Sequence, residues 1–311
     1  MLVRIDGVQV YLDDSGAGEP VLLLHAAASS GVQWQKIKMA LNPGHRVLIP
    51  DLLGEGRTPG RKDWSGLLEA EGRLIRALIE STGGPVHVVG HSYGGVVAMR
   101  LALQFPHLFS SLILIEPVAF HLLTAYPRNQ DYTELMMVKE ACRSALEGGD
   151  ALSAARCFVA YWSGEQAWNS LPEPVRHLLA SGMEKVVWGW EAITADSRRL
   201  NDFRCITAPT IMVSGDRSPL PIQWVARQLA ATIPAAKFVQ VGNAGHMSPI
   251  THGPEIIRIV QSHVESAAKT VRLWQSREES LWRTEAVPDA SPETRPPVAS
   301  WSHLQSPGVK R

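Results

Sequence analysis

Short apolar runs alternate with longer amphipathic segments along the first 116 residues of the chain. The apolar runs have the composition of strands buried on both faces: Pro20–His25, Arg46–Pro50, Pro85–Val89 and Ser111–Glu116. The segments between them have the apolar spacing of helices: Val32–Leu41, Leu67–Ile79 and Val96–Leu103. Since parallel strands need crossover connections, this alternation predicts an α/β fold with a mostly parallel sheet flanked by helices.

The pattern differs in two other parts of the chain. Two runs, Leu2–Ile5 and Val8–Leu12, flank Asp6–Gly7 and predict a hairpin. Residues 117–204 contain no strand-like run and are predicted to form a helical cap over the sheet. The alternation then resumes, with strands predicted over 210–214 and 237–241 and helices over 222–231 and 254–268.

This pattern predicts a core formed by residues 1–116 and 205–268, a cap formed by 117–204, and a tail formed by 269–311. The tail contains scattered proline, serine, arginine and glutamate without a lasting hydrophobic period. Such a composition buries little apolar surface, so we expect the tail to be disordered or loosely docked.

Composition and charge exclude several classes of partner. The chain has 30 basic and 30 acidic residues, interleaved, which gives no electrostatic reason to bind nucleic acid or an anionic membrane. No uncharged apolar stretch has the length of a membrane span, and the N-terminus lacks the apolar segment of a signal peptide. The three cysteines form no C-x-x-C pair, which favours a reduced, cytoplasmic protein.

A serine lies between glycines where a predicted strand meets a predicted helix. The stretch is Gly90–Gly95, with the sequence GHSYGG, and Ser92 is its serine. G-x-S-x-G in this context indicates a nucleophile elbow, a turn so tight that the serine is strained and neighbouring side chains would clash. The following helix would direct its positive end at an oxyanion. We predict that Ser92 is a nucleophile; the alternative is a glycine-rich turn with an idle serine.

A serine hydroxyl needs a base within hydrogen-bond reach, and His246 is the best candidate. It follows the last predicted strand, in a loop that contains Gly242 and Gly245. His25 ends an earlier strand, and we expect His91 to pack rather than react. No two histidines have the spacing of a metal site, and no nucleotide-binding glycine motif is present, so we expect neither metal nor cofactor.

Taken together, residues 1–268 resemble the α/β-hydrolase superfamily of serine hydrolases. The matching parts are Leu22–His25 with the small-residue loop after it, the turn Asp51–Gly56, the stretch Gly90–Gly95, and Gly245–His246. The resemblance implies the α/β-hydrolase fold, the order nucleophile, acid, histidine along the chain, and an oxyanion hole of backbone N–H groups. The implied donors are the N–H groups of Ala27 and Tyr93.

The acid that orients the histidine has two candidates. Most members of the superfamily carry it in a G-x-x-D pattern, but Ser218 occupies the fourth position here and Asp216 stands two places early. Other members take the acid from the end of the strand after the elbow helix, where this chain has Glu116. Since an unpaired buried carboxylate is costly, we predict Glu116 as the acid and keep Asp216 as the alternative. Their non-catalytic interpretations are a salt bridge and a turn cap, respectively.

The predicted cap is rich in aromatic residues. Its tryptophans include Trp162, Trp168 and Trp188. They could pack the cap onto itself and the sheet, or line an apolar substrate pocket. We name these three as candidate pocket residues.

The sequence thus predicts a cofactor-independent serine hydrolase. Its expected substrate is a small molecule, a carboxylic ester, thioester or lactone with an apolar acyl part, cleaved through an acyl-enzyme. One alternative is C–C bond hydrolysis by the same triad. Another is a catalytically silent ligand-binding homologue. The sequence leaves open the natural substrate and whether copies of the chain form a homo-oligomer.

Overall fold

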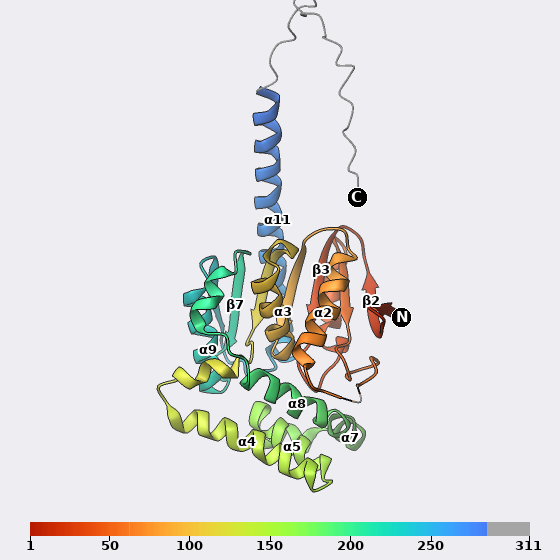
Figure 1. The fold of residues 1–311 in the computed structure, drawn as a ribbon, viewed down its shortest axis with the longest axis vertical. Helices are drawn as coiled ribbons and strands as arrows, with labels where there is room; N and C mark the ends of the chain where they lie inside the picture. The colour runs from red at the N-terminus through yellow and green to blue at the C-terminus, as the bar shows by residue number, and fades with distance from the viewer. Residues whose placement is uncertain (62, 285–311) are drawn as a thin grey trace, which may run out of the picture. The chain divides into compact units, whose positions relative to one another are not determined.

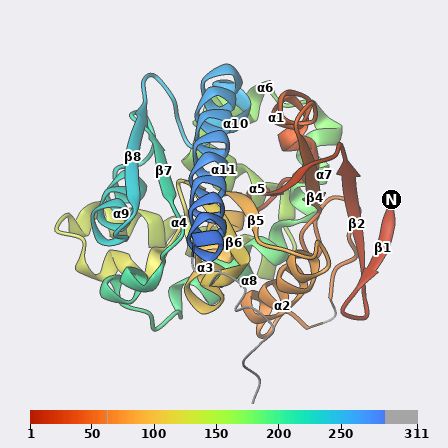
Figure 2. The same cartoon turned by 90° about the horizontal axis from the view of Figure 1, so that it is seen from above.

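The computed structural model describes residues 1–61 and 63–284, without the side chains of residues 129 and 270–284. Over these residues the chain forms an eight-stranded sheet with the order β1-β2-β4-β3-β5-β6-β7-β8. The strands are β1 (Leu2–Ile5), β2 (Val8–Ser15), β3 (Glu19–Leu24), β4 (His45–Pro50), β5 (Val86–His91), β6 (Phe109–Ile115), β7 (Thr210–Gly215) and β8 (Ala236–Val241). Figure 2 shows β1 and β2 at one edge of this sheet and β7 and β8 at the other.

Strand pairing confirms the predicted sheet. β1 pairs antiparallel with β2, and β2 pairs antiparallel with β4. The other five pairings are parallel, from β4 through β3, β5, β6 and β7 to β8. The carboxyl ends of β3, β5, β6, β7 and β8 therefore meet at one edge of the sheet, where α/β proteins place their ligand sites.

Helices cover both faces of the sheet because alternate strand residues point to opposite sides. Leu22 and Leu24 of β3 face one apolar cluster, to which α2 (Leu67–Glu80), α3 (Tyr93–Gln104) and α9 (Leu220–Thr232) contribute. Val21 and Leu23 face the other cluster, whose helices are α1 (Gln35–Leu41) and α11 (Gly253–Thr284). Buried apolar residues thus fill both sides of each central strand, as the continuous apolar runs predict.

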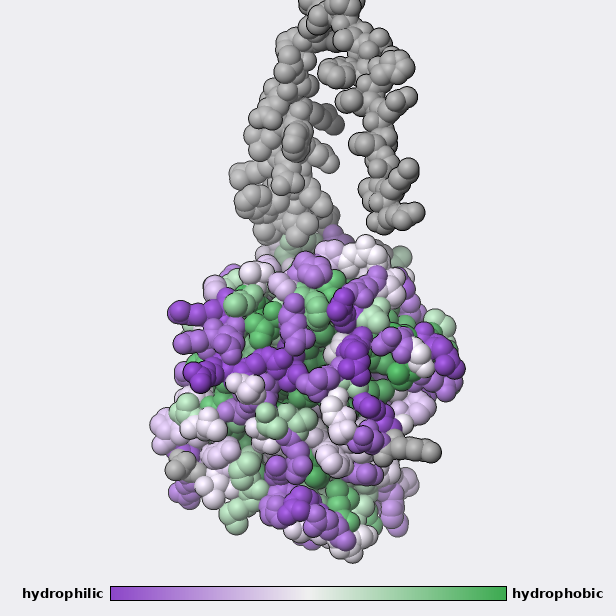
Figure 3. Space-filling model, in the orientation of Figure 1, coloured by the Kyte–Doolittle hydropathy of each residue, from purple (hydrophilic) through white to green (hydrophobic). Residues whose placement is uncertain are grey.

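Residues 117–204 form helices that lie beyond the ends of the strands in Figure 1. They are η3 (Phe120–Ala125), α4 (Asn129–Glu147), α5 (Ala151–Ser163), α6 (Glu165–Ser170), α7 (Glu173–Ser181), α8 (Met183–Thr194) and η4 (Leu200–Cys205). We call α4–α8 the cap. Residues 1–268, cap included, form one compact unit, so the division into core and cap as separate domains stays a prediction. On the face shown in Figure 3, hydrophilic and hydrophobic residues are interspersed.

The last helix is longer than the sequence pattern predicts. It was expected over 254–268, but α11 continues to Thr284. No glycine or proline interrupts the chain between Glu255 and Thr284, so nothing breaks the helical backbone there. The predicted tail, 269–311, is therefore helical over 269–284, and 285–311 lie outside the described residues. Among the described helices, none has both the length and the apolar character needed to cross a bilayer.

Candidate active site

Ser92 lies in a strained turn between β5 and α3. Its backbone angles are φ 55° and ψ −116°, outside the regions that residues other than glycine normally occupy. Two hydrogen bonds hold it there: its N–H donates to the carbonyl of Ile115 on β6 at 2.9 Å, and its carbonyl accepts from Val96 N–H at 3.2 Å. The neighbouring strand and the first turn of α3 therefore stabilise a conformation that the residue alone would avoid.

Two glycines permit this turn because the backbone passes close on both sides. A Cβ atom at Gly90 would lie 2.6 Å from the Gly94 carbonyl oxygen. A Cβ atom at Gly94 would lie 2.5 Å from the carbonyl oxygens of Leu24 and His25 on the neighbouring segment. Contacts this short are not tolerated, so both positions require glycine, as the motif predicts.

Ser92, His246 and Glu116 form one chain of hydrogen bonds. His246 Nε2 lies 3.0 Å from Ser92 Oγ, and His246 Nδ1 lies 2.7 Å from Glu116 Oε2. Since a carboxylate only accepts, Nδ1 carries the proton and Nε2 is free to accept the hydroxyl proton of Ser92. Ser92 and Glu116 directly follow β5 and β6, and His246 lies in the loop after β8. Ser92 and His246 are 154 positions apart along the chain.

The surroundings of Glu116 stabilise its charged form. The residue is fully buried, and its Oε1 accepts hydrogen bonds from Ser214 Oγ at 2.9 Å and Gly215 N–H at 2.7 Å. Burial raises the pKa of Glu116, but hydrogen bonds and the interaction with His246 outweigh burial and lower the pKa overall. Asp216, the alternative acid, is exposed at the end of β7, so the carboxylate bonded to His246 is that of Glu116.

His91 supports the loop that carries His246. Gln33 Nε2 lies 3.0 Å from His91 Nδ1, which assigns the imidazole proton to Nε2, and Nε2 donates to the backbone carbonyl of His246 at 2.9 Å. Burial and the nearby His246 lower the pKa of His91 well below its ordinary value, so this histidine is neutral. The sequence indicated only packing at this position, because a bond across 155 residues has no local signal.

The residues predicted to supply the oxyanion donors lie beside Ser92. Ala27 and Tyr93 both line the small cavity that contains Ser92. His25, directly before the loop of Ala27, is fully buried and holds that loop: its Nδ1–H donates to the Ala26 carbonyl at 2.7 Å, and its Nε2 accepts from Leu52 N–H at 3.0 Å. Burial lowers the pKa of His25 to about 3, so its role is structural.

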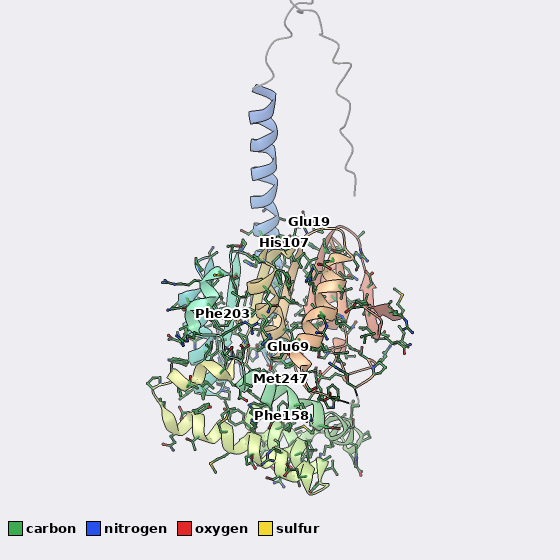
Figure 4. The ribbon with its side chains drawn as sticks, viewed as in Figure 1. Glu19, Glu69, His107, Phe158, Phe203 and Met247 are labelled. Carbon is green, nitrogen blue, oxygen red and sulfur yellow. The ribbon has the colours of Figure 1, made fainter. Side chains whose placement is uncertain are left out.

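Aromatic and aliphatic residues, most of them from the cap, line a small cavity beside Ser92. Its volume is about 30 Å³. Trp162 lies against His246, with ring centroids 4.0 Å apart and planes inclined by 26°. The remaining lining residues are Val118, Phe120, Phe158, Val186, Trp190 and Ile193. In Figure 4, Phe158 is labelled on the cap helices, and Met247, which follows His246, at the end of the core nearest to them.

Of the three tryptophans predicted for a pocket, only Trp162 lines this cavity. Trp168 is buried elsewhere, beneath the guanidinium of Arg176, and Trp188 is 41% exposed. On α8 the cavity is instead lined by Val186, Trp190 and Ile193, which share one helix face. Trp188, two positions from Trp190, points to the opposite side. In the sequence, the four-residue spacing of Val186 and Trp190 was the signal that could have identified this helix face.

The sheet, the turn at Ser92 and the histidine after β8 define an α/β-hydrolase fold. The chain belongs to the Alpha/beta hydrolase family, whose model matches residues 21–259. It is 28% identical to Lipase LipV of Mycobacterium tuberculosis, over 83% of this chain and 98% of the relative. It is 27% identical to a putative carbamate hydrolase, RutD, of Pantoea ananatis, over 75% of this chain and 83% of the relative.

A solved structure shows the same fold. The enol-lactonase from Burkholderia xenovorans superposes with a TM-score of 0.69, covering 85% of this chain and all of the lactonase. The sequence identity is 18%, so this similarity concerns the fold alone. Family and fold together confirm the resemblance inferred from the motifs.

Proposed function

We propose that this α/β hydrolase is a serine hydrolase that cleaves a carboxylic ester, thioester or lactone. The observation that carries the proposal is the hydrogen-bonded chain Ser92–His246–Glu116 at the carboxyl ends of the strands. It has the geometry that makes a serine hydroxyl nucleophilic, with a base in reach and an acid that orients the base.

In the proposed reaction, Ser92 Oγ attacks the acyl carbonyl while His246 Nε2 takes the hydroxyl proton. Glu116 stabilises the imidazolium that forms and remains unprotonated. The backbone N–H groups of Ala27 and Tyr93 hold the oxyanion of the tetrahedral intermediate, supported by the positive end of α3. His246 then protonates the leaving group, and a water molecule activated by His246 hydrolyses the acyl-enzyme.

The cavity suggests the size and polarity of the group that binds beside Ser92. Its walls are almost entirely apolar, which favours a hydrocarbon group over a charged one. Its volume is only about 30 Å³, so we expect the group that binds there to be short. We therefore propose a substrate with a short apolar acyl part.

The named relatives support an acyl-type substrate without selecting one. LipV is named a lipase, and RutD a putative carbamate hydrolase. Both names describe, for those proteins, hydrolysis at a carbonyl carbon that bears a heteroatom leaving group. That is the chemistry for which the Ser92–His246–Glu116 chain is suited.

A fluorophosphonate probe tests the proposal directly, since it reacts only with an activated serine. We expect it to label the protein at Ser92, and Ser92→Ala to abolish both labelling and hydrolysis of p-nitrophenyl esters, thioesters and lactones. Ser111→Ala, at a buried serine of β6 bonded to His87, is the matched control and should stay reactive. Labelling that persists in Ser92→Ala would refute the assignment. A protein that binds acyl ligands without turnover would instead be a silent homologue.

A further inference from the structure

A lysine of the cap is buried inside the core beside the predicted oxyanion loop. Lys185 lies on α8, and 2% of its side chain is exposed. Its Nζ forms ion pairs with two buried carboxylates, Glu55 Oε1 at 3.2 Å and Glu71 Oε1 at 3.5 Å. Glu55 lies in the loop after β4 and Glu71 on α2, so the three side chains join the cap to two elements of the core.

Glu55 holds the loop that contains Ala27. Its Oε1 accepts a hydrogen bond from the N–H of Ala28 at 2.9 Å, and its Oε2 lies 3.3 Å from Nδ1 of His25. Ala28 has φ 53°, a left-handed conformation that is unfavourable for residues other than glycine. The bond from Glu55 thus fixes a strained residue directly after the predicted oxyanion donor Ala27.

The same lysine contacts the residue that carries the second donor. Lys185 Nζ lies 4.3 Å from the centroid of the Tyr93 ring, in a cation–π contact. One helical turn later, α8 comes so near this ring that a Cβ atom at Gly189 would lie 3.2 Å from Tyr93 Cε2. Helix α8 therefore packs directly on the residue that follows Ser92.

We propose that Lys185 is a positioning residue, through which cap helix α8 holds the backbone donors of Ala27 and Tyr93 in place for catalysis. The inference rests on the proposed serine hydrolase function. Lys185 does not touch the reacting atoms; it acts through Glu55 and Ala28 on one side and through the Tyr93 ring on the other.

The charges explain why a lysine is needed at this position. Burial raises the pKa values of both Glu55 and Glu71, and the charge of Lys185 lowers them. Without Lys185, Glu55 would therefore take up a proton more readily. A protonated Glu55 accepts a weaker hydrogen bond from Ala28 N–H, since charge-assisted bonds are the stronger ones. Ala28 could then relax out of its left-handed conformation and move the neighbouring N–H of Ala27 away from the oxyanion.

Lys185→Met tests this role, with Lys139→Met as the matched control. Lys139 is another cap lysine in an ion pair, 3.7 Å from Glu191, away from Ser92. With p-nitrophenyl acetate, we expect Lys185→Met to lower kcat about 10- to 100-fold with KM changed less than about threefold, because oxyanion donors act on the transition state. Lys139→Met should retain both constants. A lysine that only docks the cap would chiefly raise KM.

A double-mutant cycle with Ala28→Gly separates positioning from general stability. Glycine adopts φ 53° without strain, so the loop depends less on Glu55 for its conformation. We expect the loss of kcat caused by Lys185→Met to be at least about threefold smaller in the Ala28→Gly background. Where Lys185→Met does not fold by circular dichroism, Lys185→Gln replaces it in the same cycle.

Two results would overturn the inference while leaving the proposed function intact. One is that the folded Lys185→Met variant has an unchanged kcat, while the wild type is active and Ser92→Ala abolishes that activity. The other is an equal loss of kcat with alanine and with glycine at position 28. A wild type that no acyl substrate or fluorophosphonate probe engages would instead refute the proposed function itself.

Discussion

Glu116 Oε2 lies 2.7 Å from Nδ1 of His246, although the two residues are 130 positions apart in the chain. Glu116 directly follows β6, the strand after the elbow helix, and has φ 44°, which turns its backbone out of the strand conformation. Its other oxygen is fixed by donors at the end of β7. The carboxylate is thus held between two strands and directed at the imidazole.

Glu116→Gln should lower kcat by about 10²–10⁴-fold, with little change in fold. An amide keeps the size of the side chain but cannot stabilise an imidazolium, and it can select the wrong tautomer of His246. Steady-state kinetics with a p-nitrophenyl ester and circular dichroism check this expectation.

Asp216→Asn is the control for that prediction. Asp216 is exposed, and its removal should leave kcat within about twofold. The reverse pattern, a large loss from Asp216→Asn and none from Glu116→Gln, would transfer the role of the acid to Asp216.

Ser218→Asp should partly restore activity to a variant without Glu116. Ser218 is buried at the fourth position of the G-x-x-D pattern, three residues after Gly215, whose N–H donates to Glu116 Oε1. In the Glu116→Ser background, we expect Ser218→Asp to raise kcat at least about tenfold. A folded double variant no more active than Glu116→Ser would show that an aspartate at 218 cannot reach His246.

The stability of the protein should depend on the protonation of Glu71. Burial is the largest influence on the pKa of Glu71 and raises it to about 7, against an ordinary value of 4.5. A carboxyl with a raised folded pKa favours folding most below pH 4.5, and that contribution is lost as pH rises through 7. A pKa shift of this size corresponds to about 3 kcal/mol in the free energy of unfolding. The free energy of unfolding of Glu71→Gln, relative to wild type, should therefore increase between pH 5 and pH 8.

Urea unfolding at several pH values measures this difference. Glu80→Gln is the control on the same helix: its carboxylate is exposed and pairs with Arg76, and such surface pairs contribute little. The relative stability of Glu80→Gln should change little over the same range. A Glu71→Gln difference that is flat from pH 5 to pH 8 would contradict a raised pKa.

Phe158→Ala should shift substrate preference towards longer acyl chains. Phe158 lines the cavity of about 30 Å³ and is only half-buried, so its truncation enlarges the cavity at modest cost to the fold. Wild type should hydrolyse p-nitrophenyl acetate faster than the octanoate. The variant should raise the octanoate-to-acetate ratio of kcat/KM about tenfold or more, since single methylenes change specificity by about 10- to 200-fold.

Phe238→Ala, a half-buried phenylalanine of β8 outside the cavity, is the control for this change. It should lower stability without altering the ratio. An equal shift in both variants would mean that loosened packing, rather than cavity size, changes the preference.

Local sequence patterns predicted the individual strands and the tight turn at Ser92, because each depends chiefly on the residues next to it in the chain. Continuous apolar runs indicated strands buried on both faces, and the two apolar clusters lie on those two faces. Gly90 and Gly94 were predicted from the tightness of a turn, and the close contacts at these positions require glycine. The end of α11 was mispredicted because a helix continues where no residue breaks it, even as its composition changes.

What the sequence by itself determined is the order of the elements and the candidate nucleophile, base and acids, since strand periodicity and turn chemistry are local. Only the tertiary structure decided which carboxylate is bonded to His246, that His91 supports the His246 loop, and that Lys185 joins α8 to Glu55 and Glu71. These contacts join residues far apart in the chain. They exist because strand order and helix packing bring those residues together, and burial then makes each charge or donor need a partner.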